Sequence, residues 1–163
     1  MCNAISAHLG SRQVSRVLYG SIIGLALVVA LEAHPPRAAA IAVTLLATAI
    51  AVGLAEFYSD LVGTETRTRA RVGRQQMIDI LAEVGATAIG VAFPSAFFIL
   101  AALGAIDLDA AFAVAKWSGL GLITAYGFAA ARLTGETVLG SLRRAAVAGL
   151  IAGFLIAIKA LLH

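Results

Sequence analysis

Charged residues are scarce in this sequence. They make up 13% of its 163 residues, whereas hydrophobic residues make up 61%. Soluble globular domains carry about 25% charged and about 45–50% apolar residues. So few charges cannot cover the exterior of a soluble fold of this length, and the mean hydropathy of +0.95 points the same way. The composition therefore predicts a surface that faces lipid, in a single transmembrane domain over residues 1–163.

Residues that carry catalytic or metal chemistry are also few. Cys2 is the only cysteine, which excludes an internal disulfide and a cluster of cysteine metal ligands. The histidines His8, His34 and His163 show no metal-ligand spacing. The sequence contains no phosphate-binding loop, nucleophile elbow or zinc-binding His-Glu helix. We therefore expect neither an enzyme nor a bound cofactor.

Long apolar runs take the place of charge. A helix needs about 20 apolar residues to cross a bilayer core of about 30 Å, and lipid cannot hydrogen-bond an exposed backbone. The runs predict an all-α integral membrane bundle of five transmembrane helices. The predicted spans are about residues 14–33, 38–58, 82–106, 110–131 and 143–162, with residues 59–81 as a cytoplasmic connection.

Proline positions divide the runs further. Pro35 and Pro36 interrupt the first hairpin. Pro94 lies inside the third run and predicts a kink, because proline lacks the backbone N–H that a helix needs. In the connection we expect the second helix to project past the membrane. A short separate helix near residues 67–80 should then lead into the third span.

The placement of arginine predicts the orientation. Cytoplasmic segments of membrane proteins are enriched in lysine and arginine. With five spans, the N-terminus and the second and fourth connections share one side, whereas the other side holds Arg37 and Lys159. This predicts a multi-pass protein of the cell membrane with a cytoplasmic N-terminus and an external C-terminus. The arginines on the predicted cytoplasmic side are Arg12, Arg16, Arg67, Arg69, Arg71, Arg74, Arg132, Arg143 and Arg144.

Six of these arginines are interpreted as topology anchors near anionic lipid headgroups. The cluster at residues 67–74 has no aromatic platform beside it, so nucleic-acid binding is not expected. The lipid bilayer is the predicted partner. The predicted anchors are Arg67, Arg69, Arg71, Arg74, Arg143 and Arg144.

Carboxylates near the cytoplasmic end are the candidate functional residues. Glu56 lies inside the second span, where a charge is costly and usually faces a bundle interior or a water path. Asp60 follows at a spacing of four, and Asp79 and Glu83 repeat that spacing before the third span. Oxygen ligands of this kind suit Fe2+ or Mn2+, with Glu56 as metal ligand. The alternative is that the acids pair with the arginines of residues 67–74 and with lipid headgroups.

One lysine and two pairs of glycines predict how the helices contact one another or the membrane surface. Lys116 is expected to extend its amine to the membrane surface, or to pair with Asp107 or Asp109. Gly20 and Gly24 on the first helix have the spacing that lets two helices approach closely. That spacing suits a homodimer with the first helix near its axis, and it suits contacts within one chain equally well. Gly149 and Gly153 repeat it on the last helix.

The order of these segments resembles the vacuolar iron transporter (VIT) family over most of the chain. Residues 55–59, Ala-Glu-Phe-Tyr-Ser, are similar to the family's Gly-Glu-Tyr-x-Ser, and Pro94 falls where its third span carries a proline. Residues 127–162, with Gly135 and Gly149, are similar to its last hairpin. The resemblance implies transport of iron or manganese in exchange for protons. It also implies Glu56 as pathway ligand, with Asp60, Asp79 and Glu83 at the cytoplasmic entrance.

The sequence also departs from the VIT pattern. Ile23 stands where the family has a pathway aspartate, and Val52 stands where it has a methionine. The connection is short and basic, so the cytoplasmic metal-binding domain of some members is missing. The alternative function is a transport-inactive membrane scaffold or partner subunit of the same fold. Carriage of another small solute is a third reading.

Overall fold

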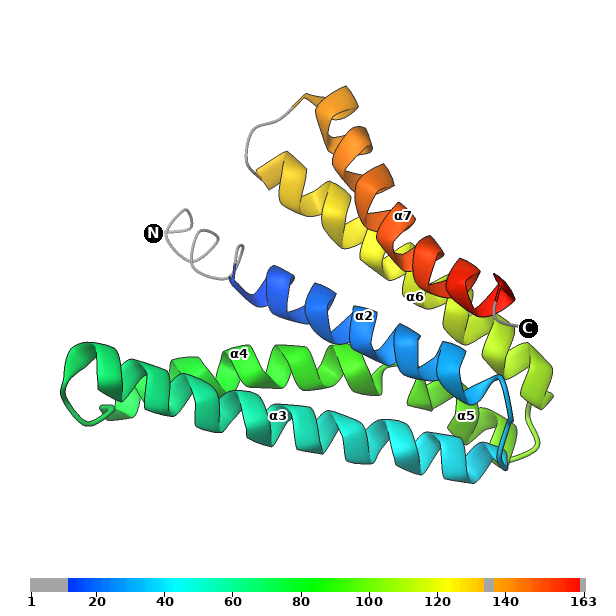
Figure 1. Cartoon of the computed structure of the whole chain (residues 1–163), viewed down its shortest axis with the longest axis horizontal. Coiled ribbons are helices and arrows are strands. Elements are labelled where there is room, and N and C mark those ends of the chain that lie inside the picture. Colours follow the sequence, from blue (N-terminus) through cyan, green and yellow to red (C-terminus); the bar gives the residue numbers. More distant parts are fainter. Residues whose placement is uncertain (1–11, 134–136, 162–163) are drawn as a thin grey trace.

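The computed structural model describes residues 12–133 and 137–161, and their regular elements are all helices (Figure 1). The predicted all-α fold class is therefore confirmed for the described part of the chain. In chain order the helices are α2 (Arg12–Leu31), α3 (Ala38–Thr68), α4 (Arg74–Ala92), α5 (Ser95–Ala102), α6 (Leu108–Leu133) and α7 (Val138–Leu161).

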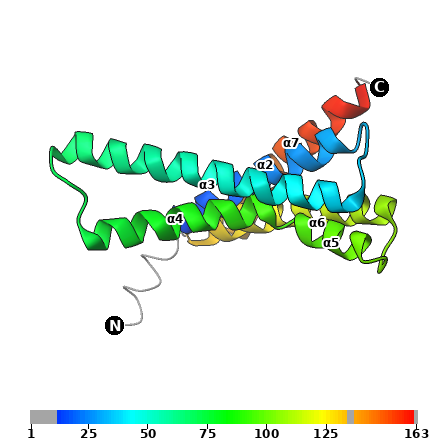
Figure 2. The same ribbon diagram turned by 90° about the horizontal axis from the view of Figure 1, so that it is seen from below.

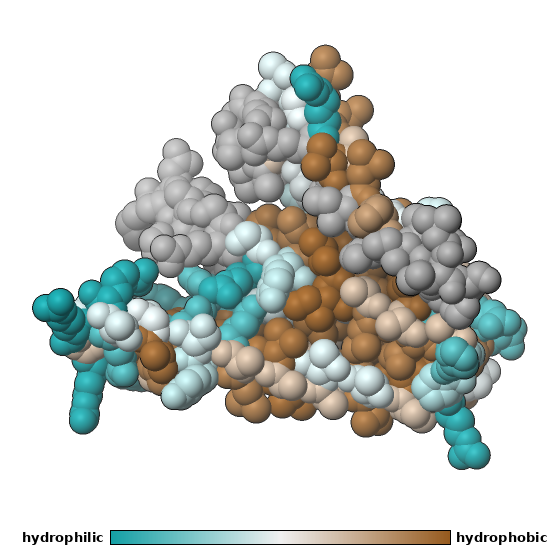
Figure 3. All heavy atoms as spheres, in the orientation of Figure 1, coloured by the Kyte–Doolittle hydropathy of each residue, from teal (hydrophilic) through white to brown (hydrophobic). Residues whose placement is uncertain are grey.

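Two helices in the described part of the chain are long and apolar enough to cross a membrane, namely α2 over Val14–Leu31 and α3. The bent pair of α4 and α5 adds a third if it forms one span. These apolar helices indicate association with a membrane. The surface agrees, because apolar side chains cover the middle of the bundle and hydrophilic ones gather toward its two ends (Figure 3). Length and apolar composition thus identify two or three spans among the described helices, and the number five stays a prediction.

The connection between α3 and α4 agrees with the prediction in part, because α3 continues past residue 58 as expected. α3 has 31 residues and extends for about 46 Å at 1.5 Å per residue, which exceeds a bilayer core of about 30 Å. It ends at Thr68, and the C-cap residue Arg69 has a left-handed φ of 51°. α4 begins at Arg74 and continues without a break into the third apolar run. The separate short helix expected near residues 67–80 is therefore absent, and its residues belong mostly to the two long helices.

The third predicted span is broken where proline predicted a kink. α4 ends at Ala92, α5 begins at Ser95, and the two are bent by 45°. Pro94 is the N-cap residue of α5. Its ring removes a backbone donor and crowds the preceding turn, which interrupts the helix.

α2 occupies the centre of the bundle, between α4 and α6 (Figure 1). α3 packs along α4 and α5 and touches α2 only slightly. α7 packs mainly against α6, and this hairpin diverges from the other helices (Figures 1 and 2). The charged end of α2 is therefore placed beside α3 and α4.

Glycines bring α2 and α4 into backbone contact. A Cβ at Gly20 would collide with the carbonyl oxygen of Thr87, and one at Gly24 would lie 3.0 Å from that of Val91. From the other side, a Cβ at Gly90 would lie 2.6 Å from the carbonyl oxygen of Val17. The small-residue face of α2 is thus covered by α4 of the same chain. The predicted homodimer stays a prediction, and this face is not free to be its axis.

The largest apolar core lies toward the end where α2 leads into α3. It includes Val28, Leu45, Phe98 and Phe112, and the two phenylalanine rings meet edge to face at 4.9 Å. The first turns of α2 are different, because every residue with a described side chain in 14–19 is half-buried or exposed. The last turns of α2 are therefore buried in the apolar core, whereas the first turns combine the glycine contact with α4 and polar side chains.

Candidate functional site

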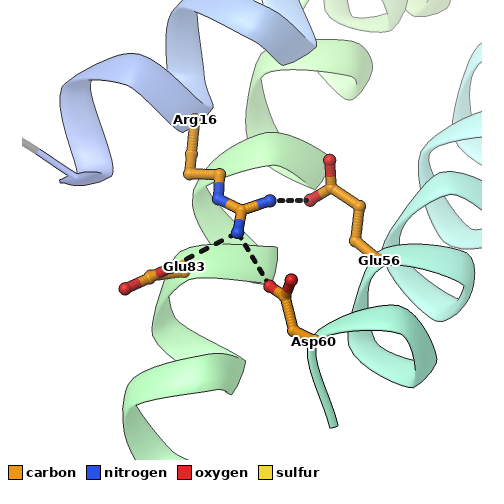
Figure 4. Close-up of polar contacts among 4 residues, drawn as sticks. All are labelled: Arg16, Glu56, Asp60 and Glu83. Atoms are coloured by element: carbon orange, nitrogen blue, oxygen red, sulfur yellow. Dashed lines mark hydrogen bonds and ion pairs between the residues drawn. The ribbon is translucent and has the colours of Figure 1, made fainter. Parts of the chain in front are cut away.

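Four charged side chains from three helices meet at the arginine-rich end of the bundle (Figure 4). Arg16 of α2 lies between Glu56 and Asp60 of α3 and Glu83 of α4. Its Nη1 lies 3.3 Å from Glu56 Oε2. Its Nη2 donates to Asp60 Oδ2 at 2.8 Å and to Glu83 Oε2 at 3.4 Å. These four residues are referred to below as the Arg16 cluster.

Glu56 is the most enclosed carboxylate of the Arg16 cluster. Its side chain is 14% exposed, compared with 27% for Arg16. Glu56 Oε2 is shielded from solvent and accepts no hydrogen bond from the described residues, so charge attraction to Arg16 is its stabilising contact. Removing one partner of a buried ion pair costs about 3–5 kcal/mol, because the remaining charge is left in a poor solvent. Partial exposure lowers that cost here.

Helical spacing explains why these residues meet. Arg16, Gly20 and Gly24 follow one another at intervals of four and share a face of α2. The two glycines bring that face against α4, which places Arg16 within reach of Glu83. Glu56 and Asp60 are also four apart, so both carboxylates of α3 point toward the same guanidinium.

An open cleft of about 740 Å³ adjoins the Arg16 cluster. α2, α3 and α4 all contribute to its walls, which include Arg16, Asp60 and Glu83 together with Arg67 and Asp79. Its other lining residues are Ser15, Ser59, Gly63, Thr64, Gln76 and Ile80. The cleft therefore combines carboxylates, guanidinium groups, hydroxyls and an amide beside the enclosed Glu56.

The structure brings three of the four predicted acids together and leaves Asp79 apart. Asp79 is exposed on α4 and accepts a hydrogen bond from Gln75 Nε2 at 3.4 Å. It lines the cleft, but Arg16 contacts only the other three acids among the described residues. The four predicted carboxylates are thus near one another, and only three share a cation.

Four of the arginines interpreted as anchors lie close to the cleft along the chain. Arg67, Arg69, Arg71 and Arg74 are exposed around the connection between α3 and α4. Glu56, Asp60 and Glu83 each form an ion pair with Arg16. The alternative pairing of the acids with arginines of residues 67–74 and with lipid headgroups stays a prediction. Arg143 is exposed near the start of α7, and the side chain of Arg144 lies outside the described residues, as does Gly135.

The geometry of the Arg16 cluster does not form a metal site. No group of three or more His, Cys, Asp or Glu side chains in the described part of the chain is arranged to hold a metal ion. The guanidinium of Arg16 lies where the carboxylates of α3 and α4 converge (Figure 4). A divalent cation at that point would meet a positive charge. In this conformation Glu56 is paired with Arg16, and its role as a metal ligand stays a prediction.

A second ion pair lies toward the other end of α2. Lys116 Nζ of α6 donates to Glu32 Oε1 at 2.6 Å. Glu32 directly follows α2, and both side chains are partly buried. The sequence had suggested extension to the membrane surface or pairing with Asp107 or Asp109. The structure places the lysine against Glu32 because α6 packs directly on α2.

Arg16 is the important site residue that the sequence analysis missed. It was assigned only to the set of arginines that determine orientation, since it precedes the first apolar run. A signal was present, because Arg16 continues the interval of four that connects Gly20 and Gly24. A charge on the same face as a close helix contact points toward the bundle interior.

The comparisons with known proteins found no counterpart. No protein-family model matches the chain, and neither a curated protein nor a solved structure matches it significantly. The resemblance to the VIT family therefore rests on the sequence motifs alone and stays a prediction.

Proposed function

We propose that this chain is a five-span membrane protein of VIT-like fold that exchanges a divalent cation, such as Fe2+ or Mn2+, for protons. The observation that carries the proposal is the enclosed Glu56 beside an open polar cleft. A carboxylate in this position is expensive to maintain, and such residues usually mark ion or proton paths in membrane proteins. In the described part of the chain, Glu56 and Asp60 share a single cationic partner.

The lengths of the last two helices support the proposed five spans. α6 has 26 residues and α7 has 24, which correspond to about 39 Å and about 36 Å at 1.5 Å per residue. Both lengths exceed a bilayer core of about 30 Å. Lys116, which interrupts the apolar sequence of α6, is neutralised by Glu32 and is therefore tolerated within a bundle.

The distribution of arginine supports a cytoplasmic location for the cleft. Arg67 lines the cleft, and Arg69, Arg71 and Arg74 surround the adjacent connection. By the positive-inside rule this end faces the cytoplasm of the cell. The proposed cation then enters past Asp60, Asp79 and Glu83 and reaches Glu56, which binds either the cation or a proton. A divalent cation is exchanged for two protons, one carried by Glu56 and the other by Asp60 on the same face of α3.

The second candidate is a transport-inactive scaffold or partner subunit, and a specific observation favours it. Arg16 connects α2, α3 and α4 through three ion pairs, as expected of a residue that stabilises the packing of helices. Ile23 and Val52 also replace two of the three pathway residues that the VIT resemblance would require. With this role, the Arg16 cluster stabilises the bundle and no ion passes.

Proteoliposomes distinguish the two functions. We expect a pH gradient to drive uptake of Mn2+ or Fe2+ by the wild-type protein, and Glu56→Gln to reduce the initial rate at least tenfold. The matched control is Glu65→Gln on the same helix, because a glutamine oxygen can still accept the hydrogen bond that Val72 N–H donates to Glu65 Oε1. This control should keep the rate within about a factor of two. Absence of metal-dependent flux, or flux unchanged by Glu56→Gln, would overturn the transport proposal and favour the scaffold.

A further inference from the structure

We propose that Arg16 is a tethered counter-cation, which occupies the carboxylates of α3 and α4 and must leave them before a metal cation binds. This inference deepens the proposed function and rests on it for its physiological meaning. The primary observation is geometric. The guanidinium contacts one oxygen each of Glu56, Asp60 and Glu83, at 3.3, 2.8 and 3.4 Å. These are the acids that a cation entering from the cleft would meet.

Competition between Arg16 and a metal follows from shared ligands. The carboxylate oxygens that contact a guanidinium are also the ligands that hard divalent cations prefer. A divalent cation among these three carboxylates would lie close to the guanidinium, and their mutual repulsion in a partly buried site disfavours binding of both. Loss of Arg16 would leave Glu56 and Asp60 of α3 without a cation among the described residues. A bound divalent ion would then supply the missing charge.

The surroundings of Arg16 provide room for it to leave. On one side lies the open cleft of about 740 Å³. On another side of the same turns of α2, an open apolar groove of about 510 Å³ is lined by Val14, Val17, Ile89 and Tyr126, among others. Residues with few buried contacts open at low free-energy cost. The side chain of Arg16 is 27% exposed, so the guanidinium can move by rotation of its own side chain while the backbone at Val17 stays against α4.

The opposite end of α2 provides the fixed point for such a movement. Leu25, Val28 and Val29 are buried in the two apolar clusters, and Glu32 is held by Lys116. Gly24 is in close contact with the backbone of α4. Arg16 can therefore be displaced by rotation of its side chain while the helix itself remains in place.

Mn2+ binding to the purified full chain in nanodiscs tests this inference without requiring transport. We expect Arg16→Ala to raise the affinity for Mn2+ at least tenfold over the wild type. The matched control is Arg67→Ala, which removes an exposed arginine from the same cleft but outside the cluster, and it should change the affinity less than about threefold. Adding Glu56→Gln and Asp60→Asn to Arg16→Ala should abolish the gain. An unchanged affinity in Arg16→Ala, or an equal gain in Arg67→Ala, would overturn the inference.

A second measurement keeps the test decisive if Arg16→Ala folds poorly. Methylguanidinium at millimolar concentration should raise the thermal midpoint of Arg16→Ala, because it reproduces the missing group, and tetramethylammonium at equal ionic strength should not. Arg16→Lys, which keeps the charge, should bind Mn2+ no more than about threefold more tightly than the wild type. Stabilisation by both organic cations alike, or a gain in Arg16→Lys as large as in Arg16→Ala, would contradict a tethered counter-cation.

The binding test of Arg16 and the flux test of the proposed transport can fail independently. Tight Mn2+ binding by Arg16→Ala, with no flux in any variant, would overturn transport and leave the role of Arg16 standing. Flux that depends on Glu56 but is accompanied by no change in Mn2+ binding when Arg16 is replaced would overturn the role of Arg16 alone.

Discussion

Arg16 and Asp60 are 44 positions apart in the sequence, and Arg16 Nη2 lies 2.8 Å from Asp60 Oδ2. This contact joins the start of α2 to α3, although the two helices otherwise barely touch. The Arg16 cluster is therefore the principal connection between these helices at the end that lacks the large apolar core.

Replacement of Arg16 should destabilise the bundle. Arg16→Gln leaves Glu56 without its counter-charge in a site that is largely shielded from water. We expect a loss of about 1–3 kcal/mol in the free energy of unfolding, below the full value for a buried pair because Arg16 is partly exposed. Chemical unfolding in mixed micelles measures this loss. Arg71→Gln, at an exposed position of the connection, is the control and should change stability by less than about 0.5 kcal/mol.

The glycine contact between α2 and α4 should be intolerant of a methyl group. Gly20→Ala places a Cβ against the backbone carbonyl of Thr87, so the helices must separate. The expected cost is about 1–3 kcal/mol, as for other overpacked sites. Gly63→Ala is the matched control on α3, because no atom outside its own helical turn lies within 4 Å of the added carbon. A thermal midpoint lowered equally by both substitutions would contradict the close contact.

Lys116 and Glu32 should be energetically coupled. A double-mutant cycle with Lys116→Met and Glu32→Gln should give an interaction energy of about 0.5–2 kcal/mol, as expected for side chains in direct contact. The same cycle with Lys116→Met and Asp109→Asn should give a value near zero. A larger coupling to Asp109 would support the pairing suggested by the sequence instead of the one in the structure.

Membrane topology provides a prediction that is independent of any site. In a Cys2→Ser background, Arg71→Cys should react with a membrane-impermeant thiol reagent only after the cells are opened. Asp107→Cys should react in intact cells, because it lies in the connection at the opposite end of the bundle. A reporter fused after His163 should behave as external. A cytoplasmic signal from that reporter would show that the number of spans is not five.

Much of the fold followed from local sequence. Apolar runs predicted the helices, and the bend at Pro94 followed from the chemistry of proline alone. The helix boundaries were less accurate, since the short helix predicted in the α3–α4 connection belongs to α3 and α4. Local composition does not show at which residue a polar helix ends when that end packs against another helix.

The candidate site was predicted only in part. The interval of four predicted that Glu56 and Asp60 share a face, and the structure confirms that both reach one cation. The sequence did not predict that Arg16 is this cation, because the arginines of residues 67–74 lie closer to the acids along the chain. Asp79 was grouped with the other acids, yet it contacts Gln75 on its own helix.

The sequence by itself determined the helical class, the apolar surface and the spacing of acids along α3 and α4, because these depend on composition and on the period of one helix. Only the tertiary structure decided that Arg16 neutralises Glu56 and that Lys116 meets Glu32. Both pairings connect residues far apart in the chain, and they depend on how closely the glycines of α2 let α4 approach and on how α6 packs against α2. An ion pair of this kind is a property of helix packing, which no single stretch of sequence contains.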